Sequence, residues 1–248
     1  MVAVRVENLT KKYGETVALD GVNLQVNGGE LFGLLGVNGA GKTTLIKILS
    51  ALSLPTEGLA LVCGRDVVSE RTEVKRLIDI SPQETSVALN LTVRENLEFF
   101  ARLYYSDSAE KKRAVEEVTE EFGLGEVAEK RAKTLSGGWQ RRLSIAIALI
   151  SHPKVLFLDE PTLGLDVFAR RELWKIIGNL RGKITIILTS HYLEEIEALC
   201  DRVAILAKGR VVAQGTVEEL KAASGEEKFE EAFIKLVGET GSLGEVGA

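Results

Sequence analysis

Apolar residues alternate with polar ones near the start of the chain, follow a helical spacing in the middle, and form short strand-like runs between helical segments towards the end. Valines at every second position over 2–6 predict a half-buried strand, and a looser alternation over 17–26 predicts another. The run at 31–35 is apolar throughout, which is typical of a strand buried on both faces. A helical pattern over 43–52 follows, so a strand, a glycine-rich turn and a helix are expected in succession.

The middle of the chain is predicted to be mainly helical. Residues 92–95 (TVRE) match a capping box, which marks the start of a helix. Further helices are expected over 108–122 and 137–150. Because strand patterns flank residues 84–150 on both sides, this block is predicted to be a helical subdomain inserted into an α/β core. The apolar stripe of the helix that starts at the capping box is assigned to Val93, Leu97, Phe100 and Tyr104.

Strands and helices alternate in the last part of the chain. This alternation predicts a mainly parallel sheet with helices on both faces. A short helix is expected within 224–237, and residues 241–248 are expected to fray. The strands are expected over 155–158, 184–188, 203–206 and 211–213, and the helices over 166–180 and 193–200.

Length, charge and cysteine content narrow the class of protein. The 248 residues allow one large domain, and the formal net charge of −5 argues against a nucleic-acid-binding surface. No stretch approaches the roughly 20 apolar residues that span a bilayer, and the acid Glu7 argues against a secretory signal. Cys63 and Cys200 fit no metal-binding spacing, which favours a reducing cytoplasm. The 24 glycines exceed the average share of about 7%. Glycine is typical of places where the backbone must bend or approach another group closely.

Several of these glycines lie in residues 36–43 (GVNGAGKT), which fit the phosphate-binding pattern G-x-x-x-x-G-K-[ST]. Glycines let such a loop wrap closely and point its N–H groups inwards, and the start of the following helix adds positive potential. Lys42 is expected to reach the β- and γ-phosphates, and the Thr43 hydroxyl to bind Mg²⁺. A plain glycine turn with an exposed lysine is the structural alternative. The predicted nucleotide contacts are Gly36, Val37, Asn38, Gly39, Ala40, Gly41, Lys42, Thr43 and Thr44.

Two acids follow the apolar run 155–158. Asp159 and Glu160 are expected at the carboxyl end of a buried strand, the edge at which parallel sheets bind ligands. Asp159 suits the Mg²⁺ shell, and Glu160 suits the general base that activates the attacking water. Alone, such a pair is more often a helix cap. Together with the loop at 36–43 it favours hydrolysis of a nucleotide phosphate.

Further motifs in a fixed order carry a family resemblance. They are KKYG (11–14), SPQ (81–83), LSGG (135–138), PTLGLD (161–166) and TSH (189–191). With these motifs the chain resembles the nucleotide-binding domains of the ATP-binding cassette (ABC) family over about residues 1–220. One position departs from the family pattern, because Trp139 follows LSGG where glutamine is most common. The departure leaves the serine and the glycines of that motif intact.

The resemblance assigns roles to residues outside the loop and the acid pair. Ser136, with Gly137 and Gly138, would bind the γ-phosphate of a nucleotide held by a second copy; a simple capped helix is the alternative. Gln83 would touch Mg²⁺ or water, although a solvated loop glutamine is the structural alternative. The remaining assignments are His191 on the γ-phosphate rather than a strand-end cap and Tyr13 on the adenine rather than strand packing. Asp166, at the end of the loop that follows the acids, is also assigned to the nucleotide-binding residues.

The resemblance also implies a division of the chain. Residues 1–83 and 151–220 would form a P-loop NTPase core with an antiparallel N-terminal β subdomain. Residues 84–150 would be the helical signature subdomain, and 221–248 a short C-terminal helical tail.

The function implied is an Mg²⁺-dependent ATPase subunit of an ABC transporter, and the stretch 90–105 and the brief tail favour the multi-subunit exporter branch. Two copies, most simply a homodimer, would close on two ATP molecules and drive a membrane permease on a separate chain, which would hold them at the inner face of the cell membrane. An importer subunit and an iron–sulfur assembly ATPase are alternatives, and the intact Glu160 and His191 argue against a binding module without turnover. The permease is expected near residues 84–105, with candidates Arg94, Phe99, Phe100, Tyr104 and Tyr105.

Overall fold

A computed structural model describes residues 1–242, with side chains described for 1–238. The first of its two sheets is antiparallel and has the strand order β2-β1-β4-β5. Val4 of β1 faces Val26 of β2 on one side and Val62 of β4 on the other, and all three side chains are buried. The alternating valines therefore form the inner face of this sheet. Its strands are β1 (Val2–Tyr13), β2 (Thr16–Asn27), β4 (Glu57–Val62) and β5 (Arg65–Asp66).

The second sheet has six strands in the order β10-β9-β3-β8-β7-β6. Its neighbours from β9 to β6 pair in parallel, and only β10 runs antiparallel to β9. All five residues of β3 are buried, as the continuous apolar run predicted. The strands are β3 (Leu31–Leu35), β6 (Ile78–Ser81), β7 (Val155–Asp159), β8 (Thr185–Ser190), β9 (Arg202–Ala207) and β10 (Arg210–Gly215). The predicted mixed α/β fold with a mainly parallel sheet is confirmed.

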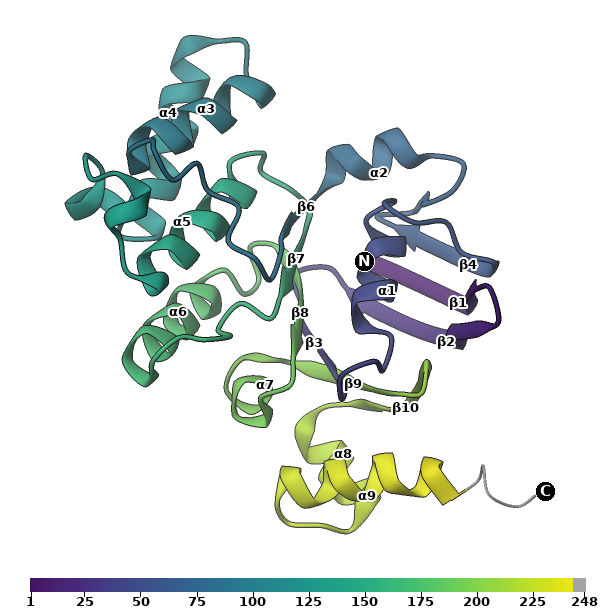
Figure 1. The fold of residues 1–248 in the computed structure, drawn as a ribbon. Coiled ribbons are helices and arrows are strands. Elements are labelled where there is room, and N and C mark those ends of the chain that lie inside the picture. Colours follow the sequence, from purple (N-terminus) through teal and green to yellow (C-terminus); the bar gives the residue numbers. More distant parts are fainter. Residues whose placement is uncertain (243–248) are drawn as a thin grey trace.

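The helices divide between the two faces of the larger sheet (Figure 1). Helix α1 lies between the two sheets, and its apolar side packs with the antiparallel strands and one face of β3 and β7. Helices α3, α4, α5, α6 and α7 share the hydrophobic core on the other face, with α8 and α9 beside β9 and β10. Their bounds are α1 (Lys42–Leu49), α2 (Arg71–Leu77), α3 (Val93–Tyr104), α4 (Ser108–Glu121), α5 (Gly137–Leu149), α6 (Val167–Asn179), α7 (Leu193–Leu199), α8 (Val217–Ser224) and α9 (Phe229–Ser242).

The predicted capping box at the start of α3 is present, because the Thr92 hydroxyl accepts from the Glu95 N–H while the Glu95 carboxylate accepts from the Thr92 N–H. The predicted apolar stripe is partly wrong. The buried row of α3 includes Val93, Leu97 and Ala101, whereas Tyr104 is 50% exposed. This position lies at the last turn of the helix, where the Tyr104 hydroxyl donates to Asp79 Oδ2 at 3.1 Å instead of entering the core.

Several short elements have no counterpart in the sequence prediction. These are β4, β5, α2, β6 and α8, although α8 carries its own capping box at Thr216 and Glu219. The helix expected within 224–237 is α9, and the frayed segment expected at 241–248 lies almost wholly outside the described residues. Within residues 1–242, no helix combines the length and the apolar character needed to cross a bilayer.

Candidate active site

The carboxyl ends of the central parallel strands converge on one cleft of about 540 Å³. The loop after β3, the residue after β7, the residue after β8 and a residue beyond β6 all reach it. The structure therefore brings together side chains that are far apart in the sequence, at the sheet edge where parallel folds bind ligands. The cleft is lined by Ala18, Asn38, Gly39, Ala40, Gly41, Lys42, Thr43, Thr44, Gln83, Glu160, Leu163 and His191.

The phosphate-binding loop depends on two glycines for different reasons. A Cβ at Gly36 would lie 2.5 Å from the carbonyl oxygen of Leu206, so only glycine fits between β3 and β9 there. Gly41 has a φ of +108° and caps α1, a backbone conformation that side chains with a Cβ rarely adopt. The loop consequently delivers the first turn of α1, with its free N–H groups, to the cleft.

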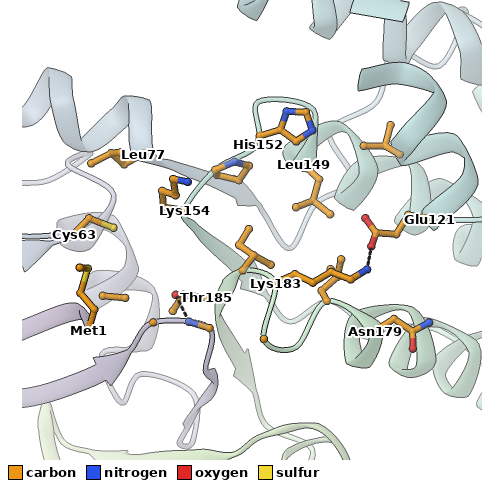
Figure 2. A pocket seen from close by; sticks show the side chains of 18 of the residues that line it. Met1, Cys63, Leu77, Glu121, Leu149, His152, Lys154, Asn179, Lys183 and Thr185 are labelled. Atoms are coloured by element: carbon orange, nitrogen blue, oxygen red, sulfur yellow. Dashed lines mark hydrogen bonds and ion pairs between the residues drawn. The ribbon is translucent and has the colours of Figure 1, made fainter. Parts of the chain in front are cut away.

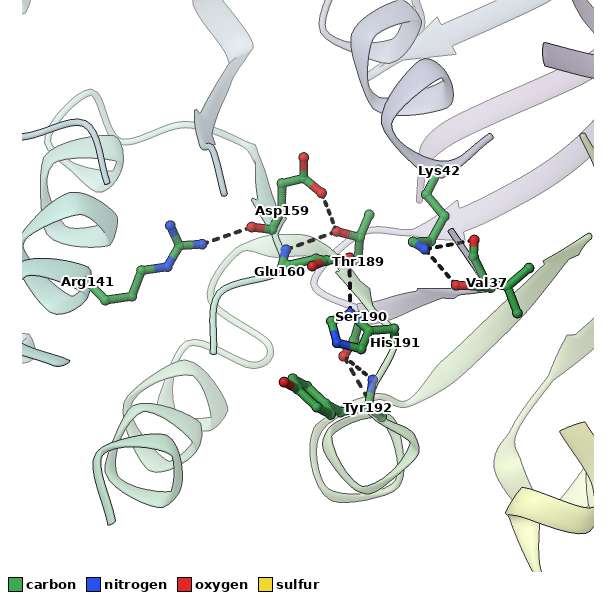
Figure 3. A network of polar contacts seen from close by, with 10 residues as sticks. Val37, Lys42, Arg141, Asp159, Glu160, Thr189, Ser190, His191 and Tyr192 are labelled. Carbon is green, nitrogen blue, oxygen red and sulfur yellow. Dashed lines mark hydrogen bonds and ion pairs between the residues drawn. The ribbon is translucent and has the colours of Figure 1, made fainter. Parts of the chain in front are cut away.

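The ammonium of Lys42 is held inside this loop (Figure 3). Its Nζ donates to the carbonyl oxygens of Gly36 at 2.6 Å and Val37 at 3.4 Å, and the side chain is buried. Burial lowers the pKa of Lys42, and the carboxylates of Glu160 and Asp159 oppose that shift. A phosphate oxygen can take the place of these carbonyls as the partner of the ammonium.

The two acids after β7 occupy different environments (Figure 3). Asp159 Oδ1 accepts from the Thr189 hydroxyl at 2.5 Å. Glu160 has a φ of +46°, which costs about 1–2 kcal/mol for a residue with a Cβ. Its N–H is fixed by the hydroxyl of Thr189 at 3.0 Å and by the Thr189 carbonyl at 3.2 Å. Thr189 of β8 therefore orients both acids, and the turn directs the Glu160 side chain into the cleft.

His191 stands directly beside the second acid. Its Nδ1 lies 3.2 Å from Glu160 Oε1, and its ring lies 4.2 Å from that of Tyr192. The turn beyond β8 is fixed because the Tyr192 N–H donates to the Ser190 hydroxyl at 2.9 Å. The histidine and the predicted base thus form one polar pair at the mouth of the cleft, although they are 31 positions apart in the sequence.

Arg141 is a residue near the site that the sequence analysis missed. It belongs to α5, is buried, and donates to the carbonyl oxygen of Asp159 at 3.0 Å (Figure 3). It also donates to the carbonyl oxygen of Pro161 at 2.8 Å. It also donates to Pro82 and Gln83, next to β6. Its only sequence signal is a charged residue within a helix that is otherwise buried from Leu143 onwards.

The second predicted anion site is separate from the cleft. Ser136 and Gly137 are exposed at the start of α5, and the Ser136 side chain makes no capping hydrogen bond to that helix. Trp139 packs against the helical core, and the Arg142 guanidinium lies 4.5 Å from its ring centre. The start of α5 therefore offers free N–H groups to the surface rather than to the chain's own loop.

Two further predicted contacts also lie outside the cleft lining. Asp166 caps α6, because one of its carboxylate oxygens accepts from the N–H groups of Phe168 and Ala169, each at 2.9 Å. Tyr13 ends β1 with 49% of its surface exposed, and the ammonium of Lys11 lies 4.7 Å from its ring centre. The structure leaves the nucleotide contacts assigned to these two residues as predictions.

Residues suited to hold Mg²⁺ are present at the cleft. Thr43 and Gln83 line it and offer a hydroxyl and an amide oxygen, whereas Asp159 lies outside the lining, at the end of β7, one residue before Glu160. Its carboxylate completes a set of oxygen ligands, which magnesium prefers. Among the described residues, no cluster of three or more His, Cys, Asp or Glu side chains forms a metal site. This donor set suits a cation that takes most of its ligands from phosphate oxygens and water.

A larger cleft, of about 1270 Å³, lies at the opposite edge of the sheet, where β7 and β8 begin (Figure 2). In it Lys183 pairs with Glu121 at 2.8 Å, and the Gly29 N–H donates to the Thr185 hydroxyl at 2.9 Å. None of the predicted site residues lines it. The convergence of functional side chains, not volume, therefore distinguishes the candidate site.

The chain is similar to known transporter ATPases. A family model described as "ABC transporter" matches residues 19–163. A daunorubicin resistance ATP-binding protein of Streptomyces coeruleorubidus is 42% identical over 98% of this chain and 76% of its own length. A doxorubicin resistance ATP-binding protein of Mycobacterium tuberculosis is 44% identical over 90% of this chain and 69% of its own length.

Solved structures agree with this similarity. A protein from Clostridium perfringens, described as part of an ABC transporter complex, has a TM-score of 0.85 and 29% identity and covers 99% of both chains. An ATP-binding cassette solved as a dimer in a post-hydrolysis state with ADP and Pi has a TM-score of 0.75 and 28% identity, over 86% of this chain and 98% of its own. The chain therefore belongs to the ABC transporter family, as an ATP-binding and ATP-hydrolysing subunit.

Proposed function

We propose that two copies of this chain bind two Mg-ATP molecules between them and hydrolyse them to drive export through a membrane permease on a separate polypeptide. The observation that carries the proposal is the cleft that gathers residues 38–44 of the loop with Gln83, Glu160 and His191. The relatives named for drug resistance support export over import or iron–sulfur assembly.

In the proposed reaction the chain binds the nucleotide through the loop amides and Lys42, which stabilise charge on the β- and γ-phosphates. Thr43, Gln83 and Asp159 would hold Mg²⁺, which supplies charge neutralisation when bound. Glu160 takes a proton from the attacking water, and His191, 3.2 Å from that carboxylate, orients it and the γ-phosphate. Tyr13 stacks on the adenine, and Ser136, Gly137 and Gly138 of the second copy close on the γ-phosphate.

The proposed docking surface for the permease is the exposed side of α3. Phe99 is 51% exposed, Leu103 65% and Tyr104 50%, and these residues share the outer part of the helix. The other candidates are engaged within the chain. Arg94 pairs with Glu129 at 2.7 Å, Phe100 packs against the core, and the Tyr105 hydroxyl donates to Ile150 O at 2.9 Å.

This surface belongs to residues 84–150, which lie between the two parts of the core in the sequence. We propose that this block moves as one unit, the helical subdomain. Its helices α3, α4 and α5 pack on one another. In this arrangement the chain is peripheral, held at the inner face of the membrane by the permease.

The test of the proposal has two parts. Purified chain should release phosphate from ATP in the presence of Mg²⁺, and EDTA should abolish that release. Tagged chain expressed in its own host should co-purify from detergent-extracted membranes with a polytopic protein, and Phe99→Asp with Leu103→Asp should release it without lowering basal hydrolysis. Absence of Mg²⁺-dependent hydrolysis would refute the reaction, and capture of soluble proteins alone would refute the role in transport.

A further inference from the structure

The guanidinium of Arg141 holds together two segments that carry the predicted chemistry. Nη2 donates to Asp159 O at 3.0 Å at the end of β7 (Figure 3), and Nε donates to Pro161 O at 2.8 Å two residues later. Nη1 donates to Pro82 O and, at 3.4 Å, to Gln83 O, both beyond β6. A single side chain thus fixes the backbone on which Asp159, Glu160 and Gln83 are mounted.

A cation in this position is costly, because Arg141 is only 4% exposed and burying a charge is unfavourable unless it is well paired. Among the described residues, no carboxylate lies within ion-pair distance of it. Burial lowers the pKa of Arg141 to about 10, while the carboxylates of Asp159 and Glu195 favour the charged form, so the group remains protonated at neutral pH. The planar fork of N–H donors matches several carbonyls at once, which a lysine ammonium does not.

Because Arg141 lies on α5, its contacts with the backbone near Asp159 and Gln83 are also connected to Ser136 at the start of that helix. Arg141 lies five residues beyond Ser136, which is about 7.5 Å along the axis of α5. The start of α5 is exposed, whereas Arg141, in the second turn of the helix, donates to the backbone carbonyl of the chain's own Asp159. Any displacement of α5 that follows engagement of Ser136 is therefore passed to the backbone of Asp159 and Gln83.

We propose that Arg141 is a positioning residue that couples the signature helix α5 to the hydrolysis site of the same chain. The inference rests on the proposed function, in which Ser136 engages the nucleotide of the second copy. One helix then senses one nucleotide and aligns the acids that hydrolyse the other. The two sites of the dimer are thereby made cooperative through Arg141.

The test is Arg141→Lys, which keeps the positive charge but removes the planar set of N–H donors that contacts several carbonyls at once. The matched control is Arg142→Lys, because the neighbouring Arg142 lies on the same helix but pairs with Glu172 and stacks on Trp139. For each variant, Tm, the Kd of a fluorescent ATP analogue, kcat and the Hill coefficient for ATP are measured. Arg141→Lys should lower kcat about tenfold and bring the Hill coefficient to one, with Kd within twofold of the wild type. Arg142→Lys should match the wild type in all four.

Three results would overturn the inference. The first is an Arg141→Lys variant whose kcat and Hill coefficient equal those of the wild type. The second is a wild-type protein whose own Hill coefficient is one. The third is a parallel fall of kcat, ATP affinity and Tm in Arg141→Lys, which would make Arg141 a purely structural residue. A wild-type chain without Mg²⁺-dependent hydrolysis would instead refute the proposed function, so the two failures are distinguishable.

Discussion

The chain contains two glycine-rich helix starts, and they have different surroundings. Helix α1 begins at Lys42 inside the cleft, next to Gln83, Glu160 and His191. Helix α5 begins at Gly137 on the surface, outside that cleft. Both offer free N–H groups and a positive end, so the local physics of anion binding is the same at each. The difference lies in what the neighbouring elements contribute.

The two helix starts differ in their surroundings because of the order of the strands and helices. The loop before α1 leaves β3. Strand β8 beside it ends in Ser190, and β7, the next strand in the sheet, ends in Asp159 at the same edge. Helix α5 belongs to the helical block, and none of its residues lines the cleft at that edge. In the proposed function it therefore completes the site of a second copy, whereas the first helix start has Glu160 beside it within its own chain.

Glu160→Gln should cause the largest change, because it removes the proposed base while keeping the size and hydrogen-bonding shape of the side chain. We expect kcat to fall about a thousandfold and ATP binding to be retained. Phosphate release and equilibrium binding measure the two effects. Glu194→Gln, an exposed site on α7, is the matched control. Steady-state hydrolysis at the wild-type rate in Glu160→Gln would show that another group acts as the base.

Lys42→Ala tests whether the start of α1 binds the phosphates of ATP. Loss of a charge-assisted contact to the phosphates should weaken ATP binding about 10- to 100-fold. Lys47→Ala is the matched control, since Lys47 lies on the same helix with its side chain in solvent. Calorimetric titration with ATP gives the comparison, and an unchanged Kd in Lys42→Ala would refute the phosphate-site assignment.

Ser136→Ala tests the second helix start. If this residue acts only on the nucleotide of another copy, kcat should fall about tenfold, while the Kd for ATP of the isolated chain stays unchanged. Weaker binding by isolated chains would indicate that the start of α5 serves its own nucleotide, and an unchanged kcat would remove it from the reaction.

The smallest expected effect is a change in the pH dependence of stability, and it concerns Glu195 of α7. Its buried carboxylate accepts from Trp174 Nε1 at 3.0 Å, and burial raises the pKa of Glu195 above its ordinary value of 4.5. The folded state therefore holds this proton more tightly than the unfolded state. The free energy of unfolding falls as the pH rises from 4.5 through the raised pKa.

Glu195→Gln removes this ionisation, so the stability of the variant relative to the wild type should increase with pH over that window. Urea denaturation at several pH values measures the difference, with Glu194→Gln as the control. Parallel pH curves for Glu195→Gln and the wild type would contradict the direction of the shift.

Local sequence patterns predicted β3 and the glycine loop of the first site, and also the start of α3 in the helical block. The apolar run of β3, the glycine loop and the capping box of α3 are each set by a few adjacent residues. Short elements such as β5, with two residues, carry too little periodicity to be recognised. Tyr104 was misassigned because its partner, Asp79, is 25 positions away.

Long-range contacts limit what the sequence can predict about the site itself. The loop at 36–44 and the acid Glu160 were predicted from local patterns, and Gln83 and His191 from the family resemblance. The fold places residues 38–44, Gln83, Glu160 and His191 in one cleft, while the predicted contacts Gly36 and Val37 lie outside its lining. Their individual roles remain predictions. Arg141 could not be identified as a clamp, because its acceptors are 18 to 59 positions away and are backbone carbonyls, which have no sequence signature.

The most direct test of the account asks whether the second helix start works on another copy's nucleotide. Light scattering after size-exclusion chromatography would compare Glu160→Gln with the double variant Glu160→Gln/Ser136→Glu, each with Mg-ATP. The account predicts that the first becomes a dimer with two trapped nucleotides, while the second still binds ATP but stays monomeric. Equal ATP-dependent dimerisation of both variants would contradict it.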